Sequence, residues 1–325
     1  MSRREIKPKQ ILLSRRANVF YLEHVRVMQK DDRIVYLTRE GGETDRFFNL
    51  PERNTAFILL GKGSSITDSA ARRLAESSVI VGFTGSGGSP LHGFVDPVFL
   101  SPQSEYRPTE YMQGWARQWF DDVLRLDMAK TFFEIRLAWV ARAWGKNPDL
   151  LKAGISPERV PSNLFREKSL GADSTARLLS VEGEWAKSLY RLLAQNYSMS
   201  DFRREEGKQA RESTTDLANS FLDHGNYIAY GYAAAALNIL GISFAFPVMH
   251  GKTRRGALVF DVADLFKDAI VLPLAFHAAA SGFRDQECRD AVIEVCQKEE
   301  VLDQVIETII SVATRKTTEN QSTTA

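Results

Sequence analysis

The sequence predicts an α+β fold, in which a small N-terminal β-rich domain precedes a larger helical domain. Short runs of β-branched and aromatic residues, separated by Asp and Gly turn signals, fill the N-terminal third of the chain. Beyond Pro108, apolar residues instead recur every three or four positions, as they do in amphipathic helices. A chain of 325 residues with 44% hydrophobic residues is large enough for two domains with a sizeable core.

The β-rich domain is expected to span residues 1–100. A helix is expected inside it, near residues 67–76, with Thr67 or Ser65 as its N-cap. The strands are predicted from their apolar runs at residues 18–21, 33–38, 56–60 and 79–83.

The helical domain is expected to span residues 101–325, and no strand is predicted in it. A linker near residues 146–174 carries no motif, and the Thr- and Ser-rich tail at 317–325 is expected to be disordered. Apolar periodicity predicts the helices near residues 108–144, 178–196, 215–240, 258–281 and 284–314.

Composition excludes several classes of protein. No apolar run approaches the roughly 18 to 20 residues that span a membrane, and the basic N-terminus lacks the apolar core of a signal peptide. A cytoplasmic protein is therefore expected. Cys288 and Cys296 lie eight positions apart on one predicted helix, about 12 Å, which is too far for a disulfide. The net charge of +1 argues neither for nor against nucleic acid.

The segment 248–268, VMHGKTRRGALVFDVADLFKD, combines residues that suit a metal site. Asp261 and Asp264 are three apart, so a helix places them on one face, among many apolar neighbours. Buried carboxylates are unfavourable unless a cation neutralises them. Together with His250, they form an oxygen-rich donor set that suits Mg²⁺ or Mn²⁺.

A third carboxylate is needed, and Glu182 at the start of an apolar helix is the candidate. Glu184 is its nearby competitor, and Glu182 also fits an ordinary first-turn acid that the helix dipole favours. Cations beside the site would attract a phosphodiester backbone, and Lys252, Arg254 and Arg255 follow His250 directly. A second basic stretch either follows a DNA strand or is a solvated loop; it comprises Arg203, Arg204, Lys208 and Arg211.

These motifs resemble those of the CRISPR-associated spacer-acquisition integrases. The run Glu182-Gly183-Glu184-Trp185-Ala186 with Tyr190 resembles the first active-site motif of that family. His250-Gly251-Lys252 and Asp261-Val262-Ala263-Asp264 resemble the second and third, and the 223–232 segment DHGNYIAYGY resembles the helix between them. The β-domain stretches RRANVFYL and LLGKGSSIT also fit, and SPQSEYRPTEY at 101–111 resembles the subtype I-F branch. The resemblance covers nearly the whole chain.

The resemblance implies a function and a set of roles. Glu182, His250 and Asp264 match the metal ligands, and Asp261 matches a nearby acid that supports the site. The family joins the 3′-hydroxyl ends of short DNA fragments into the repeat of a CRISPR array, and the same chemistry cuts branched DNA. It implies a homodimer formed through the β domain. It also implies a small Cas partner, which in subtype I-F is fused to the interference helicase-nuclease. No nucleotide co-substrate is implied.

Two other functions remain open from the residues alone. A non-catalytic DNA-binding scaffold would use only the basic stretches, and Glu182 or Asp264 would then be replaceable without loss. A metal-dependent hydrolase of small phosphoesters would use the same carboxylates. The cations beside the site and the absence of a P-loop or Rossmann phosphate-binding loop count against the hydrolase.

Overall fold

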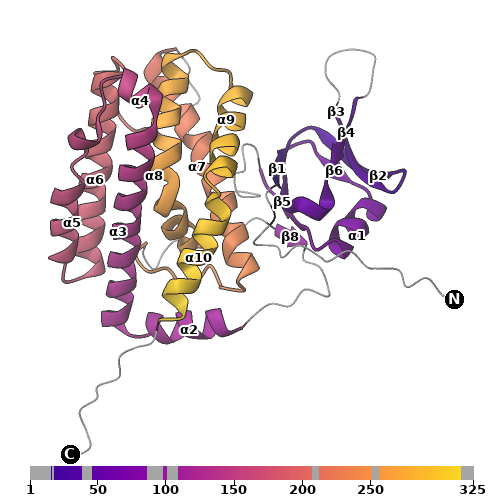
Figure 1. The fold of residues 1–325 in the computed structure, drawn as a ribbon, viewed down its shortest axis with the longest axis horizontal. Helices are drawn as coiled ribbons and strands as arrows, with labels where there is room; N and C mark the ends of the chain where they lie inside the picture. The colour runs from indigo at the N-terminus through magenta and orange to yellow at the C-terminus, as the bar shows by residue number, and fades with distance from the viewer. Residues whose placement is uncertain are drawn as a thin grey trace, which may run out of the picture.

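Strands and helices occupy different parts of the chain, as predicted (Figure 1). The computed structural model describes residue 16 and residues 18–38, 46–85, 98–100, 109–206, 212–250 and 256–315. Within these ranges, every strand lies at or before Leu100, and every long helix lies after it. The α+β fold class is therefore confirmed. The predicted disordered tail at 317–325 lies outside the described residues.

The β-rich part consists of two four-stranded sheets. One has the order β1-β5-β7-β8, with β1, β5 and β7 parallel and β8 antiparallel to β7. The other has the order β4-β3-β2-β6. The helix α1 (Asp68–Glu76) begins after Thr67, whose side chain accepts a hydrogen bond from the Ala70 amide, so the predicted cap is confirmed. The strand bounds are Asn18–Leu22 (β1), Val25–Lys30 (β2), Arg33–Thr38 (β3), Arg46–Leu50 (β4), Thr55–Leu60 (β5), Ser65–Ile66 (β6), Ile80–Phe83 (β7) and Val98–Leu100 (β8).

The central strand β5 is buried along its whole length because its two faces serve two cores. Successive side chains of a strand point to opposite faces. Ile58 and Leu60 therefore join the core between the sheets and α1, while Phe57 and Leu59 join the core of the helical part. Leu59 lies against Gly231, where a Cβ would come within 2.6 Å of its methyl group. The sheet thus packs directly on the helices.

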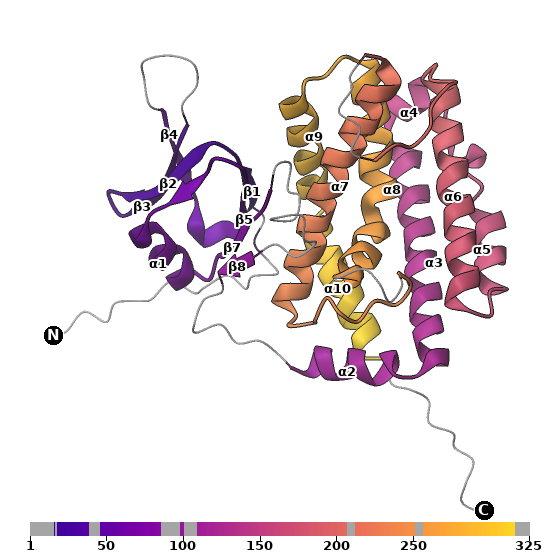
Figure 2. The same ribbon diagram turned by 180° about the vertical axis from the view of Figure 1, so that it is seen from behind.

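The helical part is a bundle, and α7 and α9 lie on its side nearest the sheets (Figures 1 and 2). Glu52–Asn54 (η2) and Pro157–Arg159 (η5) are short 3₁₀ helices. The α-helices are α2 (Glu110–Trp119), α3 (Asp122–Lys146), α4 (Pro148–Lys152), α5 (Ser162–Leu170), α6 (Thr175–Asn196), α7 (Thr214–Ile239), α8 (Ala257–Ala280), α9 (Asp285–Lys298) and α10 (Val301–Ala313).

Two of the predicted helices are each divided into two. The run at 108–144 is broken before Asp121, whose carboxylate caps the new helix α3 by accepting hydrogen bonds from the amides of residues 123 and 124. The run at 284–314 is broken at Glu300, which adopts a positive φ of 50°. The apolar residues keep a helical spacing on both sides of each break. Periodicity alone therefore predicted one long helix where the structure has two.

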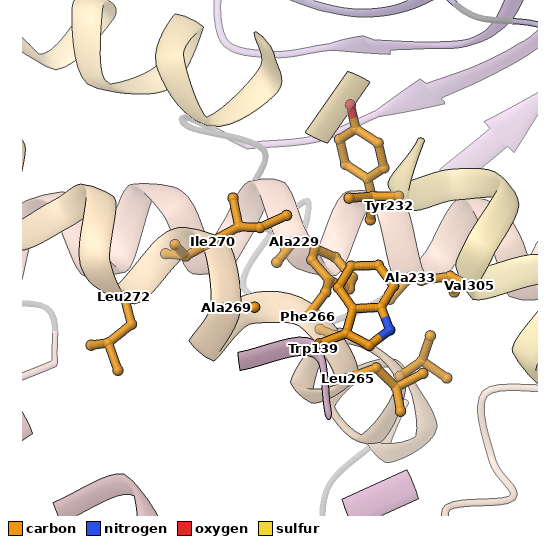
Figure 3. Packing of buried hydrophobic residues seen from close by; sticks show 14 of the residues in the cluster. Trp139, Ala229, Tyr232, Ala233, Leu265, Phe266, Ala269, Ile270, Leu272 and Val305 are labelled. Atoms are coloured by element: carbon orange, nitrogen blue, oxygen red, sulfur yellow. The ribbon is translucent and has the colours of Figure 1, made fainter. Parts of the chain in front are cut away.

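The helix α8 lies at the centre of the bundle, packed against α3 and α7, and most of its residues are buried. Phe266 of α8 packs near Trp139 of α3 and Tyr232 of α7 (Figure 3). Its ring centroid lies 6.0 Å from that of Trp139 and 6.4 Å from that of Tyr232. Acidic side chains on such a helix are therefore surrounded by protein.

None of the described helices is both long and apolar enough to cross a membrane.

The linker region at 146–174, which carries no sequence motif, is largely helical. It forms α4 and α5, joined by a short 3₁₀ turn, and its apolar side chains Leu150, Ile155 and Phe165 are buried in the helical core. The helices are too short to show a clear period, which explains why they escaped the sequence pattern. Both cysteines lie in α9, buried and free, as expected.

Candidate active site

Three separated parts of the chain meet beside the central helix. The helix α6 supplies Glu182, the segment before α8 supplies His250, and α8 itself supplies Asp261 and Asp264. The first and third of the predicted motifs are on helices, and His250 of the second lies in the described segment 241–250, outside any helix or strand. The structure therefore brings all four predicted catalytic residues into one region.

The loop that carries His250 is held by hydrogen bonds on both sides. Trp115 and Trp119 donate their indole N–H groups to the carbonyls of residues 246 and 247, at 3.0 and 2.6 Å. Asp261 accepts from the backbone amides of residues 248, 249 and 250, at 2.7, 3.1 and 3.0 Å. One buried carboxylate thus fixes three consecutive peptide groups.

Asp261 also orients the imidazole. His250 Nδ1 lies 2.6 Å from Asp261 Oδ1, so the other ring nitrogen, Nε2, is directed toward Asp264, whose Oδ2 is 3.9 Å away. A histidine that binds a metal commonly has its second ring nitrogen bonded to a carboxylate, which fixes the ring and its tautomer. Asp261 therefore holds the His250 ring in one orientation.

Asp264 is a deeply buried carboxylate of the site. Its side chain is 3% exposed, and it forms an ion pair with Lys267 and a 3.5 Å ion pair with Arg136 Nη1. Neither of its oxygens has a hydrogen-bond partner with acceptable geometry among the described residues. A buried carboxylate with unsatisfied oxygens is costly, and such groups usually mark a functional site or a missing ion.

Arg136 of α3 stands at the middle of the carboxylates. Its Nη1 lies 2.8 Å from Glu182 Oε1, and its Nε lies 2.6 Å from Asp268 Oδ2. The arginine is 2% exposed, as befits a charge that is fully paired. The indole of Trp185 donates to the same Asp268 oxygen at 2.9 Å, and Trp144 donates to the Asp268 carbonyl at 3.1 Å.

The local field is anionic. Among the described side chains gathered here, the carboxylates of Glu182, Asp261, Asp264 and Asp268 outnumber the cations Arg136 and Lys267. Burial by itself lowers the pKa of His250, but the hydrogen bond that its ring donates to Asp261 and the charges of Asp264, Asp261 and Glu182 raise it above its ordinary value. The pKa of Asp261 is raised by its burial, against the effect of its hydrogen bonds.

The structure distinguishes Glu182 from its competitor Glu184. Glu184 is exposed and pairs with Lys168 Nζ at 2.6 Å, on the outside of the bundle. Glu182 faces inward, with 15% of its side chain exposed, and contacts Arg136. Glu182 is therefore the residue that belongs to the carboxylate cluster.

The predicted DNA-binding residues are only partly described. Lys252, Arg254 and Arg255 lie outside the described residues. Arg203 is exposed, whereas Arg204 pairs with Asp223 at 2.5 Å and hydrogen-bonds Asn219 at 3.2 Å. Because Arg204 is engaged within the protein, its charge is already partly neutralised.

Sequence reasoning assigned no role to Arg136, Lys267, Asp268 or Trp185. Arg136 carries a recognisable signal, because it is a lone arginine within the apolar helix segment FFEIRLAWV. A charged residue at a position that faces the core needs a charged partner.

No described cluster of three or more His, Cys, Asp or Glu side chains meets the geometry of a metal site as it stands.

Solved structures share this fold. The crystal structure of a TtCas1-DNA complex superposes with a TM-score of 0.65 at 22% identity and covers 93% of each chain. A casposase bound to its integration product superposes with a TM-score of 0.67 at 17% identity, covering 92% of this chain and 91% of the other. At such identities the likeness concerns the fold alone.

Sequence relatives are more similar. The CRISPR-associated endonuclease Cas1 of Pseudomonas aeruginosa (strain UCBPP-PA14) is 44% identical over 317 residues, covering 95% of this chain and 96% of the relative. The protein of the same name from Pectobacterium atrosepticum is 44% identical over 315 residues, covering 94% and 95%. The family model described as CRISPR associated protein Cas1 matches residues 20–306. The chain therefore belongs to the CRISPR associated protein Cas1 family.

Proposed function

We propose that this chain is a metal-dependent DNA integrase and endonuclease of CRISPR adaptation. It joins the 3′-hydroxyl ends of short DNA fragments into the repeat of a CRISPR array, and it cuts branched DNA by the same chemistry. Family membership and the name of the 44% identical relatives, CRISPR-associated endonuclease, support a role in DNA strand transfer. The observation that carries the proposal is the convergence of Glu182, His250 and Asp264.

The residues present fit a divalent cation. Asp264 offers two buried oxygens, which pair with Lys267 and Arg136 but have no hydrogen-bond partner of acceptable geometry among the described residues. His250 offers Nε2, and Glu182 offers a carboxylate that pairs with Arg136. Carboxylate oxygens with one imidazole suit Mg²⁺ or Mn²⁺. Glu182, His250 and Asp264 would hold the ion. A bound ion would polarise the phosphoryl oxygen and stabilise the charge on the leaving 3′-oxygen.

The protein side chains have separate tasks in this reaction. Asp261 holds the imidazole of His250 with Nε2 toward Asp264, so that the donors are oriented before substrate arrives. The 3′-hydroxyl of the fragment attacks the phosphodiester, a new P–O bond forms, and the bond to the leaving 3′-oxygen breaks. The proton of the attacking hydroxyl ends on the leaving oxygen. One phosphodiester replaces another, so no nucleotide co-substrate is needed.

The proposed partners follow from the two strand joinings that a complete insertion requires. Each protomer has one such site, so a homodimer that contacts through the β-rich part would supply both. The second partner is a small Cas protein, fused in subtype I-F to the interference helicase-nuclease. Duplex fragments, branched intermediates and the CRISPR repeat are the proposed DNA substrates.

A strand-joining assay tests the function. A labelled short duplex with free 3′-hydroxyls is mixed with a plasmid that carries a repeat, in Mn²⁺ or in EDTA. Wild-type protein is expected to yield a joined product in Mn²⁺ but not in EDTA. His250→Ala is expected to yield none in either. Glu184→Ala is the matched control, because this exposed acid two residues from Glu182 pairs with Lys168 outside the site; it should join normally.

A negative result has a defined meaning. If wild type and His250→Ala both bind DNA, and neither joins it even after the small Cas partner is added, the scaffold function replaces the integrase. Joining by His250→Ala at the wild-type rate would remove His250 from the site. Competition by small phosphates as strong as that by DNA would favour the phosphoester hydrolase.

The basic residues that follow His250 are proposed to bind the DNA backbone. Replacing Arg254 and Arg255 by alanine removes two phosphate contacts, so the slope of log affinity against log salt should become shallower by about 2 for duplex DNA. Fluorescence anisotropy across a salt series measures that slope. The control removes two cations from α5 instead, by Arg166→Ala with Lys168→Ala, whose partners are Glu134 and Glu184. An unchanged slope in the first variant would show that these arginines do not contact phosphate.

A further inference from the structure

We infer that Arg136 is a positioning residue, which holds Glu182 and Asp264 in the arrangement from which they take a divalent cation; this rests on the proposed function. No motif of the sequence includes Arg136, and it lies on α3, a helix that supplies no candidate ligand. Its place in the structure nevertheless connects both carboxylates.

One nitrogen of Arg136 spans two helices. Its Nη1 lies 2.8 Å from Glu182 Oε1 on α6 and 3.5 Å from Asp264 Oδ2 on α8. Without a cation between them, two carboxylates at such short range repel each other and turn apart. The guanidinium therefore keeps both side chains facing the same point. This preorganises the donors, which otherwise would have to be assembled when the metal binds.

The guanidinium is itself held rigidly. Its Nε donates to Asp268 Oδ2 at 2.6 Å, and Trp185 donates to that same oxygen at 2.9 Å. A guanidinium is a planar fork, so fixing Nε also fixes the direction of Nη1. Trp185 lies one helical turn after Glu182 on α6. The helix that supplies one candidate ligand thus also supplies the anchor that aims the arginine.

A positioning role and a simple counter-ion role predict different changes in metal affinity when the contacts of Arg136 are disturbed. If Arg136 only balanced charge until a metal arrived, weakening its contacts would leave metal affinity unchanged or increase it, because a cation beside the site repels the ion. If Arg136 positions the ligands, disturbing its geometry lowers affinity. Groups behind the direct ligands of a metal typically contribute about 10–100-fold to affinity.

The test is Mn²⁺ binding to the full-length chain without DNA, measured from the electron paramagnetic resonance signal of free Mn²⁺. Arg136→Lys keeps the charge and loses the fork, and it is expected to weaken binding by about 10–100-fold. Trp185→Phe removes the indole N–H that donates to Asp268, together with part of the ring system, and should weaken binding in the same direction by a smaller factor. Arg142→Lys, an exposed arginine of the same helix whose partner is Gln304, should bind as wild type does.

Circular dichroism and denaturant unfolding establish that each variant is folded. If Arg136→Lys does not fold, Trp185→Phe decides, because it deletes the hydrogen bond to Asp268 and keeps an aromatic ring and the charge of Arg136 in the core. Folded variants that bind Mn²⁺ as tightly as wild type, or more tightly, overturn the positioning role while wild-type joining leaves the proposed function intact. A wild-type chain that neither binds Mn²⁺ nor joins DNA overturns both.

Discussion

Replacing Asp264 by asparagine is expected to abolish strand joining and also to destabilise the fold. The variant loses a candidate ligand, so joining should fall by more than the roughly 100-fold that a group behind a ligand contributes. It also leaves the Lys267 ammonium without its carboxylate partner at a largely buried position. Breaking a buried ion pair from one side costs about 3–5 kcal/mol, and the 22% exposure of Lys267 points to the lower end of that range.

A double variant separates the two effects. Asp264→Asn with Lys267→Met removes both members of the ion pair. The free energy of unfolding, measured in urea, should therefore recover most of what the single variant loses. Joining should stay absent, because the ligand is still missing. If the single variant joins DNA at the wild-type rate, Asp264 is not a ligand. If the double variant regains activity together with stability, the defect of the single variant was one of folding.

Replacing Arg136 by alanine is expected to have the largest effect on stability. The substitution leaves Glu182, Asp264 and Asp268 without the cation that they share, at a position where the arginine is 2% exposed. It also removes the volume of a long side chain that is packed inside the bundle. Leaving buried charges uncompensated costs about 3–5 kcal/mol.

Denaturant unfolding measures this effect through the midpoint and the slope. Arg142→Ala is the matched control on the same helix, since Arg142 is exposed and stacks over Trp139 at 5.0 Å. Its cost should stay within about 1 kcal/mol. Equal stability of the two variants would mean that another cation or protonation neutralises the carboxylates beside Arg136 when the arginine is removed.

The sequence predicted much of the fold because most elements have a strong local pattern. β5 appears as a continuous apolar run, and α8 appears as an apolar helix interrupted by acids. The strand β4 was missed because its pattern is weak: Phe47 and Phe48 are both exposed, so no alternation of buried and exposed residues marks it. The strand β8 has three residues, too few for any period.

The candidate site could be predicted in part for the same reason. Asp261 and Asp264 share a helix, so their spacing alone places them together, and His250 follows from its short distance along the chain. The choice between Glu182 and Glu184 could not be made in this way. It depends on which side of α6 faces α3 and α8, and that is a property of helix packing.

The sequence by itself determined the residue types of the site, the helix that carries both aspartates, and the order of strands before helices. These follow from spacing over a few residues, which local hydrogen bonding and apolar periodicity control. Only the tertiary structure decided that Arg136 stands among the carboxylates. Arg136 meets Glu182 across 46 positions and Asp268 across 132, and nothing local to α3 encodes those partners. They are selected because the bundle buries every face of this arginine, and a buried charge requires opposite charges within reach.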